Sequence, residues 1–226
     1  MVRGVLTALP VAALIVTLTA CSSGGGGAAT SSTPSTTTPP VPPTSRAAAT
    51  AALLTPKKVG DGWKKAAYTD PVGGLPCQSK GTNTIAQTTG AIFDVGAAFA
   101  NPNPHTSTVE EVIGYRTEAA AKAGMIAIQT GMDCVTGKTY HASGAPSTVV
   151  ISAQIDVSSK VGADTAYAWN ESTFSQQSQQ FAILVRTTIV LVRIGVYFDQ
   201  PAHVKLNPLP DNYAIAKQAR QQLQDA

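Results

Sequence analysis

The most hydrophobic stretch after the N-terminus is the run Phe181–Phe198, "FAILVRTTIVLVRIGVYF". A membrane helix needs about 20 apolar residues, and this run is interrupted by Arg186 and Arg193. Each arginine would cost ~2.5–3.5 kcal/mol near the centre of a bilayer. Because β-branched residues dominate and alternate, the run predicts a β-hairpin with its turn at Thr187–Thr188.

In this predicted hairpin, Arg186 and Arg193 point to the same face of the sheet, together with Ala182, Leu184 and Leu191. Two arginines on an apolar sheet face could mark an anion site. The simpler interpretation is that their long stems cover the sheet while the charged ends reach water.

Four other segments have the alternation or the β-branched content of strands: Thr84–Phe99 with a turn near Gly90, Val109–Tyr115, Thr148–Val157 and Asp164–Phe174. Tyr167 and Trp169 share one face of the last of these, where packing is a better explanation than a ligand platform. The polar stretch Ser175–Gln180 predicts a turn before the hairpin.

Helix signals occur at three places. Thr55 followed by Pro56 predicts a short helical turn that ends near Gly60. Thr117 is expected to cap a helix with the apolar stripe Ala121, Met125, Ile128 and Met132, and Asp211 a helix with the stripe Ile215, Ala219 and Leu223. Together with the strands, these helices predict a chain that contains both α and β structure.

The N-terminus has the pattern of an export signal, with Arg3 followed by the apolar segment Val5–Ala20. The sequence Leu18–Cys21, "LTAC", resembles the lipobox of bacterial lipoproteins. That resemblance implies a signal peptide over residues 1–20, a diacylglyceryl group on the Cys21 sulfur, and attachment to the outer face of the cell membrane. An ordinary secretory signal is the alternative.

Residues 21–45 are rich in Ser, Thr, Gly and Pro and carry no charge. Such a composition buries too little apolar surface to fold, so it predicts a flexible tether. The remaining residues, 46–226, have the size of a single domain.

Two cysteines, Cys77 and Cys134, remain once Cys21 is assigned to the lipid. Outside the cytoplasm, such a pair predicts a disulfide. The alternative, a catalytic thiol at Cys134 with His141 near it, lacks a recognisable nucleophile motif.

Composition and motifs argue against several classes of function. The formal net charge of +3 and the 13% charged residues do not favour nucleic-acid binding. The segment before Gly137-Lys138-Thr139 lacks the correctly spaced glycine of a phosphate-binding loop. His105, His141 and His203 are too scattered to predict a metal site. We therefore expect no catalytic residues, no metal and no cofactor.

The order of these features resembles the extracellular sensor domain of PknH-type receptor kinases and related lipoproteins. The resemblance rests on the lipobox and tether, "LLTPKKVG", Cys77, "VEEVIGY" and the helix "TEAAAKAGMIAIQTGMDC", followed by the apolar hairpin and a final helix. It implies an α+β fold with a central antiparallel sheet, on which the mid-chain helix and the C-terminal helix pack. It also implies a ligand-binding cleft and no enzyme activity.

The sequence therefore predicts a lipid-anchored, non-enzymatic, sensor-like domain at the cell envelope. Its expected partners are the membrane, through the anchor, and an unidentified small-molecule or envelope ligand. The alternatives are a scaffold lipoprotein that docks a membrane partner and, less favoured, a lipid carrier or an envelope hydrolase.

Overall fold

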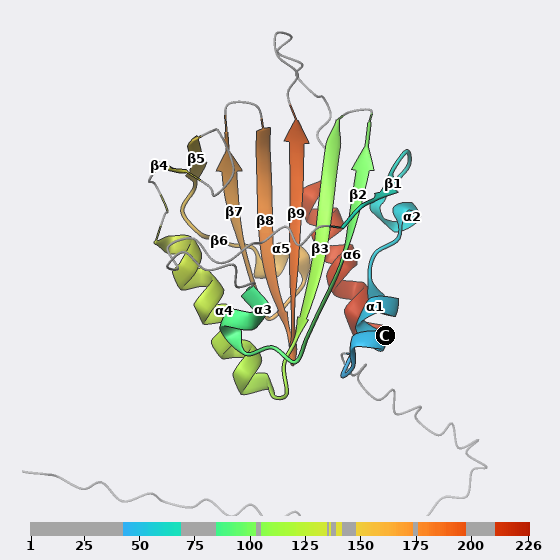
Figure 1. The fold of residues 1–226 in the computed structure, drawn as a ribbon, viewed down its shortest axis with the longest axis vertical. Coiled ribbons are helices and arrows are strands. Elements are labelled where there is room, and N and C mark those ends of the chain that lie inside the picture. Colours follow the sequence, from blue (N-terminus) through green and yellow to red (C-terminus); the bar gives the residue numbers. More distant parts are fainter. Residues whose placement is uncertain are drawn as a thin grey trace, which may run out of the picture. The chain divides into compact units, whose positions relative to one another are not determined.

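The described part of the chain forms one β-sheet with helices on both of its faces (Figure 1). The computed structural model describes residues 43–68, 85–102, 105–134, 136, 139–141, 148–173, 176–197 and 211–226, all of which belong to the compact unit Pro39–Ala226. Within these residues, the ladders between named strands are all antiparallel. The predicted α+β class with a central antiparallel sheet is thus confirmed.

Nine strands make up the sheet within the described residues. Eight of them follow the order β1-β2-β3-β9-β8-β7-β5-β4, and β6 pairs with β7 beside β5. Their bounds are β1 Lys64–Ala66, β2 Phe93–Asn101, β3 Thr106–Gly114, β4 Thr139–His141, β5 Thr148–Ile151, β6 Ile155–Asp156, β7 Thr165–Ser172, β8 Gln176–Val185 and β9 Thr188–Tyr197.

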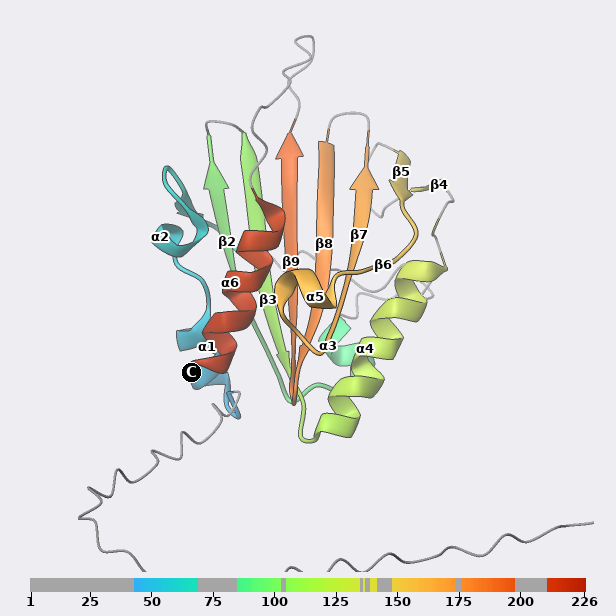
Figure 2. The ribbon, with the colours of Figure 1, turned by 180° about the vertical axis from the view of Figure 1, so that it is seen from behind.

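Four of the described helices pack on one face of the sheet and two on the other (Figure 2). The helices are α1 Arg46–Ala52, α2 Pro56–Val59, α3 Ile85–Thr89, α4 Glu118–Asp133, α5 Ser158–Val161 and α6 Asn212–Gln224. Buried residues of α1, α2, α5 and α6 share one hydrophobic cluster with the sheet, whereas α3 and α4 belong to a second cluster. We call these two sides of the sheet the α6 face and the α4 face.

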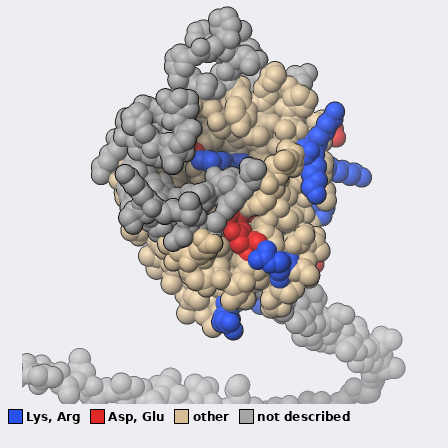
Figure 3. Space-filling model, viewed as in Figure 1, with Lys and Arg blue, Asp and Glu red and all other residues tan. Residues whose placement is uncertain are grey.

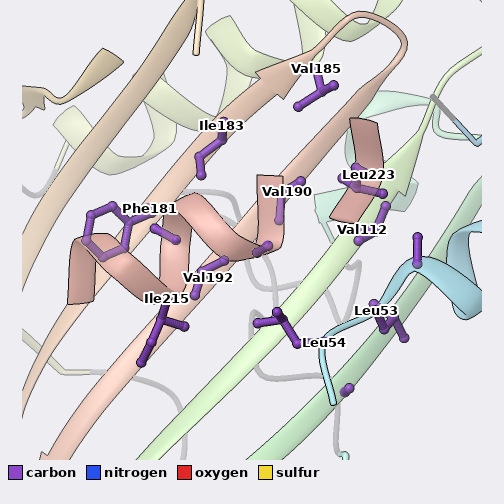
Figure 4. Close-up of a cluster of buried hydrophobic side chains, with 14 of the residues drawn as sticks. Leu53, Leu54, Val112, Phe181, Ile183, Val185, Val190, Val192, Ile215 and Leu223 are labelled. Atoms are coloured by element: carbon purple, nitrogen blue, oxygen red, sulfur yellow. The ribbon is translucent and has the colours of Figure 1, made fainter. Parts of the chain in front are cut away.

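The core of the α6 face explains why β8 and β9 are so apolar (Figure 4). Phe181 and Ile183 on β8 and Val190 and Val192 on β9 are all fully buried there. The neighbouring positions point to the α4 face, where Ala182 and Ile189 are buried as well. Strands that are covered on both sides are hydrophobic at nearly every position, which is what β9 and the part of β8 from Phe181 onward show.

The β8–β9 hairpin is confirmed, but its turn lies one residue earlier than predicted. Val185 pairs with Thr188, so Arg186 and Thr187 form the turn, and the Thr188 hydroxyl donates to the Val185 carbonyl at 2.9 Å. Arg186 adopts a φ of 51°, a left-handed conformation that is uncommon for a residue with a side chain. Placing Arg186 on a sheet face was therefore wrong, whereas Arg193 does point to the α4 face.

Three other segments differ from the prediction. The first half of Thr84–Phe99 is the helix α3, whose Thr89 hydroxyl donates back to the Ile85 carbonyl at 2.9 Å; only the part after Gly90 is a strand. Thr148–Val157 contains two short strands, β5 and β6. Of the predicted polar turn Ser175–Gln180, the described residues 176–180 are instead the beginning of β8, which pairs with both β7 and β9.

The predicted helix caps are confirmed. The side chain of Thr117 accepts a hydrogen bond from Ala120 N at 3.1 Å, and that of Asp211 accepts one from Ala214 N at 3.0 Å. Thr55 is the N-cap of α2, with Pro56 at its first position. The sequence analysis missed α1, where Ser45 caps the helix by accepting from Ala48 N at 3.2 Å.

A buried carboxylate connects the segment after α1 to the centre of the sheet. Glu110 on β3 points to the α6 face, is 0% exposed, and its Oε2 accepts a hydrogen bond from Leu54 N at 2.7 Å. Burial raises the pKa of Glu110 to about 7, although this hydrogen bond acts in the opposite direction. The N-terminal segment is thus held by a group that titrates near neutral pH.

Candidate functional site

A hollow lies on the α4 face, between helices α3 and α4 and the central strands. Its volume is about 410 Å³ when the part that is open to solvent is included. The part that a water molecule can occupy is only about 20 Å³, which is room for a single water. We call it the α4-face hollow. Its described lining residues are Ile85, Val109, Glu111, Ile128, Met132, Trp169, Gln180, Phe181, Ala182, Leu191, Val192 and Arg193.

The walls of the hollow are mostly apolar, because each element contributes its buried side. Helix α4 presents Ile128 and Met132 from the stripe that the sequence predicted, and α3 presents Ile85. Trp169 on β7 is 1% exposed and belongs to the same cluster, so the packing role expected for it is confirmed. Apolar walls with a few polar groups are typical of small-molecule sites.

The polar part of the hollow is a hydrogen-bonded cluster around Glu171. Its Oε2 atom accepts from Arg193 Nη2 at 2.6 Å, from Ser178 Oγ at 2.9 Å and from Gln180 Nε2 at 2.9 Å. These residues come from three neighbouring strands, β7, β8 and β9, and their side chains lie on the α4 face. Arg193 and Gln180 of this cluster also line the hollow.

Two opposing effects set the charge state of Glu171. Burial acts to raise its pKa, but the guanidinium of Arg193 and the hydrogen bonds from Gln180 and Ser178 outweigh burial and hold the pKa below its usual range. Glu171 and Arg193 are therefore a charged pair at neutral pH. The Arg193 side chain as a whole is 30% exposed, whereas that of Glu171 is 9% exposed.

A second contact fixes the position of α3 and α4 over the sheet. Tyr115, directly after β3, is buried, and its hydroxyl lies 2.7 Å from the Thr89 hydroxyl at the end of α3. The Tyr115 ring also lies against Gly124 of α4, where any side chain would overlap its hydroxyl. Burial is the main cause that raises the pKa of Tyr115, so it stays neutral and able to donate.

The structure places the other predicted site residues in different ways. Cys134 is the C-cap residue of α4, as expected, but Cys21, Cys77 and His203 lie outside the described residues. The lipid attachment and the Cys77–Cys134 disulfide therefore stay predictions. His105 is exposed at the end of the β2–β3 connection, and His141 lies on β4.

Neither a metal centre nor a membrane helix is found within the described ranges. No group of three His, Cys, Asp or Glu residues there is close enough to hold a metal ion. No helix of that part of the chain is both long and apolar enough to cross a membrane.

The sequence analysis missed most of the polar cluster. It identified Arg193, but it placed Ser178 and Gln180 at the edge of a turn and gave Glu171 no role. The signal that could have found them is charge complementarity: Glu171 and Arg193 are isolated charges within strongly β-type segments, and a buried charge needs a partner.

The fold and the hollow define an α+β domain with a two-sided antiparallel sheet and a small, mostly apolar hollow on one face. Among solved structures, the chain is similar to the extracellular domain of PknH from Mycobacterium tuberculosis, with a TM-score of 0.58 and 14% identity. The match covers 83% of this chain and 98% of that one. No family model and no curated protein sequence matches the chain. The fold expected from the resemblance to PknH-type domains is thereby confirmed.

Proposed function

We propose that the protein is a lipid-anchored, sensor-like binding domain on the extracytoplasmic side of the cell membrane, without catalytic activity. The observation that carries the binding role is the α4-face hollow, which has apolar walls and is lined by Gln180 and Arg193, two of the residues bonded to Glu171. The extracytoplasmic location is supported by the lipobox-like sequence before Cys21 and by the similarity to an extracellular domain.

The chemistry of the hollow favours one kind of ligand, a small molecule with an apolar body and one hydrogen-bonding group, because the Arg193 charge is already paired with Glu171 and Glu111 also lines the hollow. The apolar body would contact Ile128, Met132 and Leu191, and the polar group would hydrogen-bond to Arg193 or Gln180. Since the inner cavity holds about one water, side chains must move to admit such a ligand. Met132 is suited to this movement, because its unbranched side chain repacks easily.

Binding of 8-anilinonaphthalene-1-sulfonate, a fluorescent probe with an apolar body and a sulfonate group, tests the hollow. We expect saturable binding to the native protein and a loss of at least ten-fold in affinity in Ile128→Trp, where the larger side chain fills the cavity. Ile126→Trp is the matched control, because Ile126 lies on the same helix but is 62% exposed. Thermal melts of both variants show whether the native fold persists.

Equal probe binding by Ile128→Trp and Ile126→Trp would argue against the hollow as a ligand site. It would favour the scaffold alternative, in which an exposed surface docks an envelope partner.

The anchor is tested separately, by the mass and location of the mature protein. The native chain should begin at Cys21, carry the mass of a diacylglyceryl group, and fractionate with membranes. Cys21→Ser should lose both the added mass and the cleavage after Ala20. An unmodified native Cys21 would refute the anchor and leave the binding proposal standing.

A further inference from the structure

Four lysines form a basic edge on the domain, at the side where α2 and β1 lie. Lys57 and Lys58 belong to α2, Lys64 and Lys65 belong to β1, and all four are exposed. Figure 3 shows basic side chains gathered over this edge of the molecule. Among the described residues, none of the four forms an ion pair.

The basic edge accounts for the net charge of the whole chain. Four lysines and Asp61 within this short segment give +3, and the formal net charge of the chain is also +3. The other basic and acidic residues therefore cancel.

The segment that displays the lysines is fixed to the core. Between the two pairs, Trp63 packs against the hydrophobic cluster of the α6 face, and the Asn101 amide donates to the Asp61 carbonyl at 3.3 Å. Gly60 makes the close approach to the Trp63 ring possible at a φ of 145°, and Lys58 donates to Gln222 on α6. The basic edge is therefore a preformed surface.

Protection of a sheet edge explains only half of this arrangement. Lysines on an edge strand prevent pairing with other chains, which accounts for Lys64 and Lys65 on β1. It does not account for Lys57 and Lys58, because a helix has no unpaired edge to protect.

We propose that the basic edge binds the anionic headgroups of the membrane surface and so orients the domain on it. This inference deepens the proposed function and rests on its membrane attachment. Helix α1 lies at the same edge of the sheet as α2 and β1 but near the other end of β2 (Figure 1): Arg46 at its start donates to the Asp94 carbonyl at 2.6 Å, whereas Lys64 and Lys65 pair with Ala100 and Phe99. The described part of the chain, which begins at residue 43, therefore enters the domain at the edge that carries the lysines.

The orientation has a consequence for the α4-face hollow. Its floor strands β3, β9, β8 and β7 are two to five positions from β1 in the sheet. At a strand spacing of ~4.8 Å, they would stand roughly 10 to 24 Å above the basic edge. The hollow would then open sideways, above the headgroups, where a ligand can reach it.

Vesicle co-sedimentation of the full chain in the Cys21→Ser background tests the proposal. This background removes the acyl chains, so the result does not depend on lipidation or on a ligand in the hollow. Binding is measured on vesicles of phosphatidylcholine with phosphatidylglycerol, and on phosphatidylcholine alone to subtract the effect of the leader. A lysine near an anionic surface strengthens binding about five-fold. Replacing all four lysines by Gln should therefore weaken the binding that depends on phosphatidylglycerol by at least thirty-fold at low salt.

Two variants make the outcome specific. Replacing all four lysines by Arg should preserve binding, because the charge is kept. The control variant carries Gln in place of four exposed basic residues elsewhere: Arg116, Lys122, Arg186 and Lys217. Its net charge equals that of the first Gln variant, but its binding to anionic vesicles should weaken much less. Equal losses in the Gln variant and this control would overturn the proposal, as would unchanged binding of the Gln variant. Preferential binding to an anionic wall polymer over anionic vesicles would overturn it in favour of that partner.

Discussion

The ionisation of Glu110 makes the stability of the domain depend on pH in an unusual direction. Its pKa is raised from 4.5 to about 7 in the folded protein, where its side chain is fully buried. The folded state therefore binds the proton more tightly than the unfolded state does. This contribution to stability is complete below the unfolded pKa and is lost as the pH rises through about 7.

The size of the effect follows from the shift. At 1.36 kcal/mol per pKa unit, a full shift of this size corresponds to about 3 kcal/mol, and the part that falls between about pH 5 and pH 8 is roughly 2 to 3 kcal/mol. We expect the free energy of unfolding of the native protein to decrease by that amount over this range. Glu171 does not oppose this change, since its lowered pKa removes stability only in more acidic solution.

The assay is urea unfolding at both pH values for the native protein and for Glu110→Gln. The Gln side chain has a similar shape and an oxygen that can accept from Leu54 N, but it does not titrate. Its buried amide hydrogens lower stability equally at both pH values, so the comparison uses the change with pH rather than the absolute stability. The slope of unfolding free energy against urea concentration should stay the same in both proteins.

We expect the pH dependence to be nearly absent in Glu110→Gln. Two results would refute the reasoning: the same pH dependence in both proteins, or a native protein that is more stable at the higher pH. Either one would mean that Glu110 is ionised in the folded state with a nearly ordinary pKa.

Three other substitutions test local features of the fold by urea unfolding. Thr117→Ala should cost about 1 kcal/mol, because it removes the cap of α4, whereas Thr117→Ser should cost much less. Gly124→Ala should destabilise the protein, although alanine favours an exposed helix by about 1 kcal/mol, because its methyl group overlaps the Tyr115 hydroxyl; a stabilised variant would contradict this contact. Arg186→Gly should stabilise the hairpin by about 1 kcal/mol, because glycine adopts the positive φ without strain, and Arg186→Ala should not.

Features that depend on neighbouring residues in the chain could be predicted from the sequence. Helix α4 was found because Thr117 and the stripe from Ala121 to Met132 are local signals, and both are present as expected. The short α1 was missed because it is mostly alanine, and alanine favours a helix without marking which side is buried.

Features that depend on pairing between distant segments could not be predicted. Phe181 and Val192 lie on the same sheet face whether the turn is at Thr187–Thr188, as predicted, or at Arg186–Thr187, as observed. The hydrophobic pattern therefore does not distinguish one turn from the other. The polar start of β8 resembled a loop because the partners of its side chains lie on other strands. Only the pairing of Ser178 with Glu171 shows that these polar side chains have a partner inside the sheet.

Adjacent carboxylates on β3 show how one strand serves both sides of the fold. Successive side chains of a strand point to opposite faces. Glu110 therefore lies under the N-terminal segment, where it accepts from Leu54 N, while Glu111 lines the α4-face hollow. The sequence presents them as a single acidic pair, yet their environments are separated by the sheet itself.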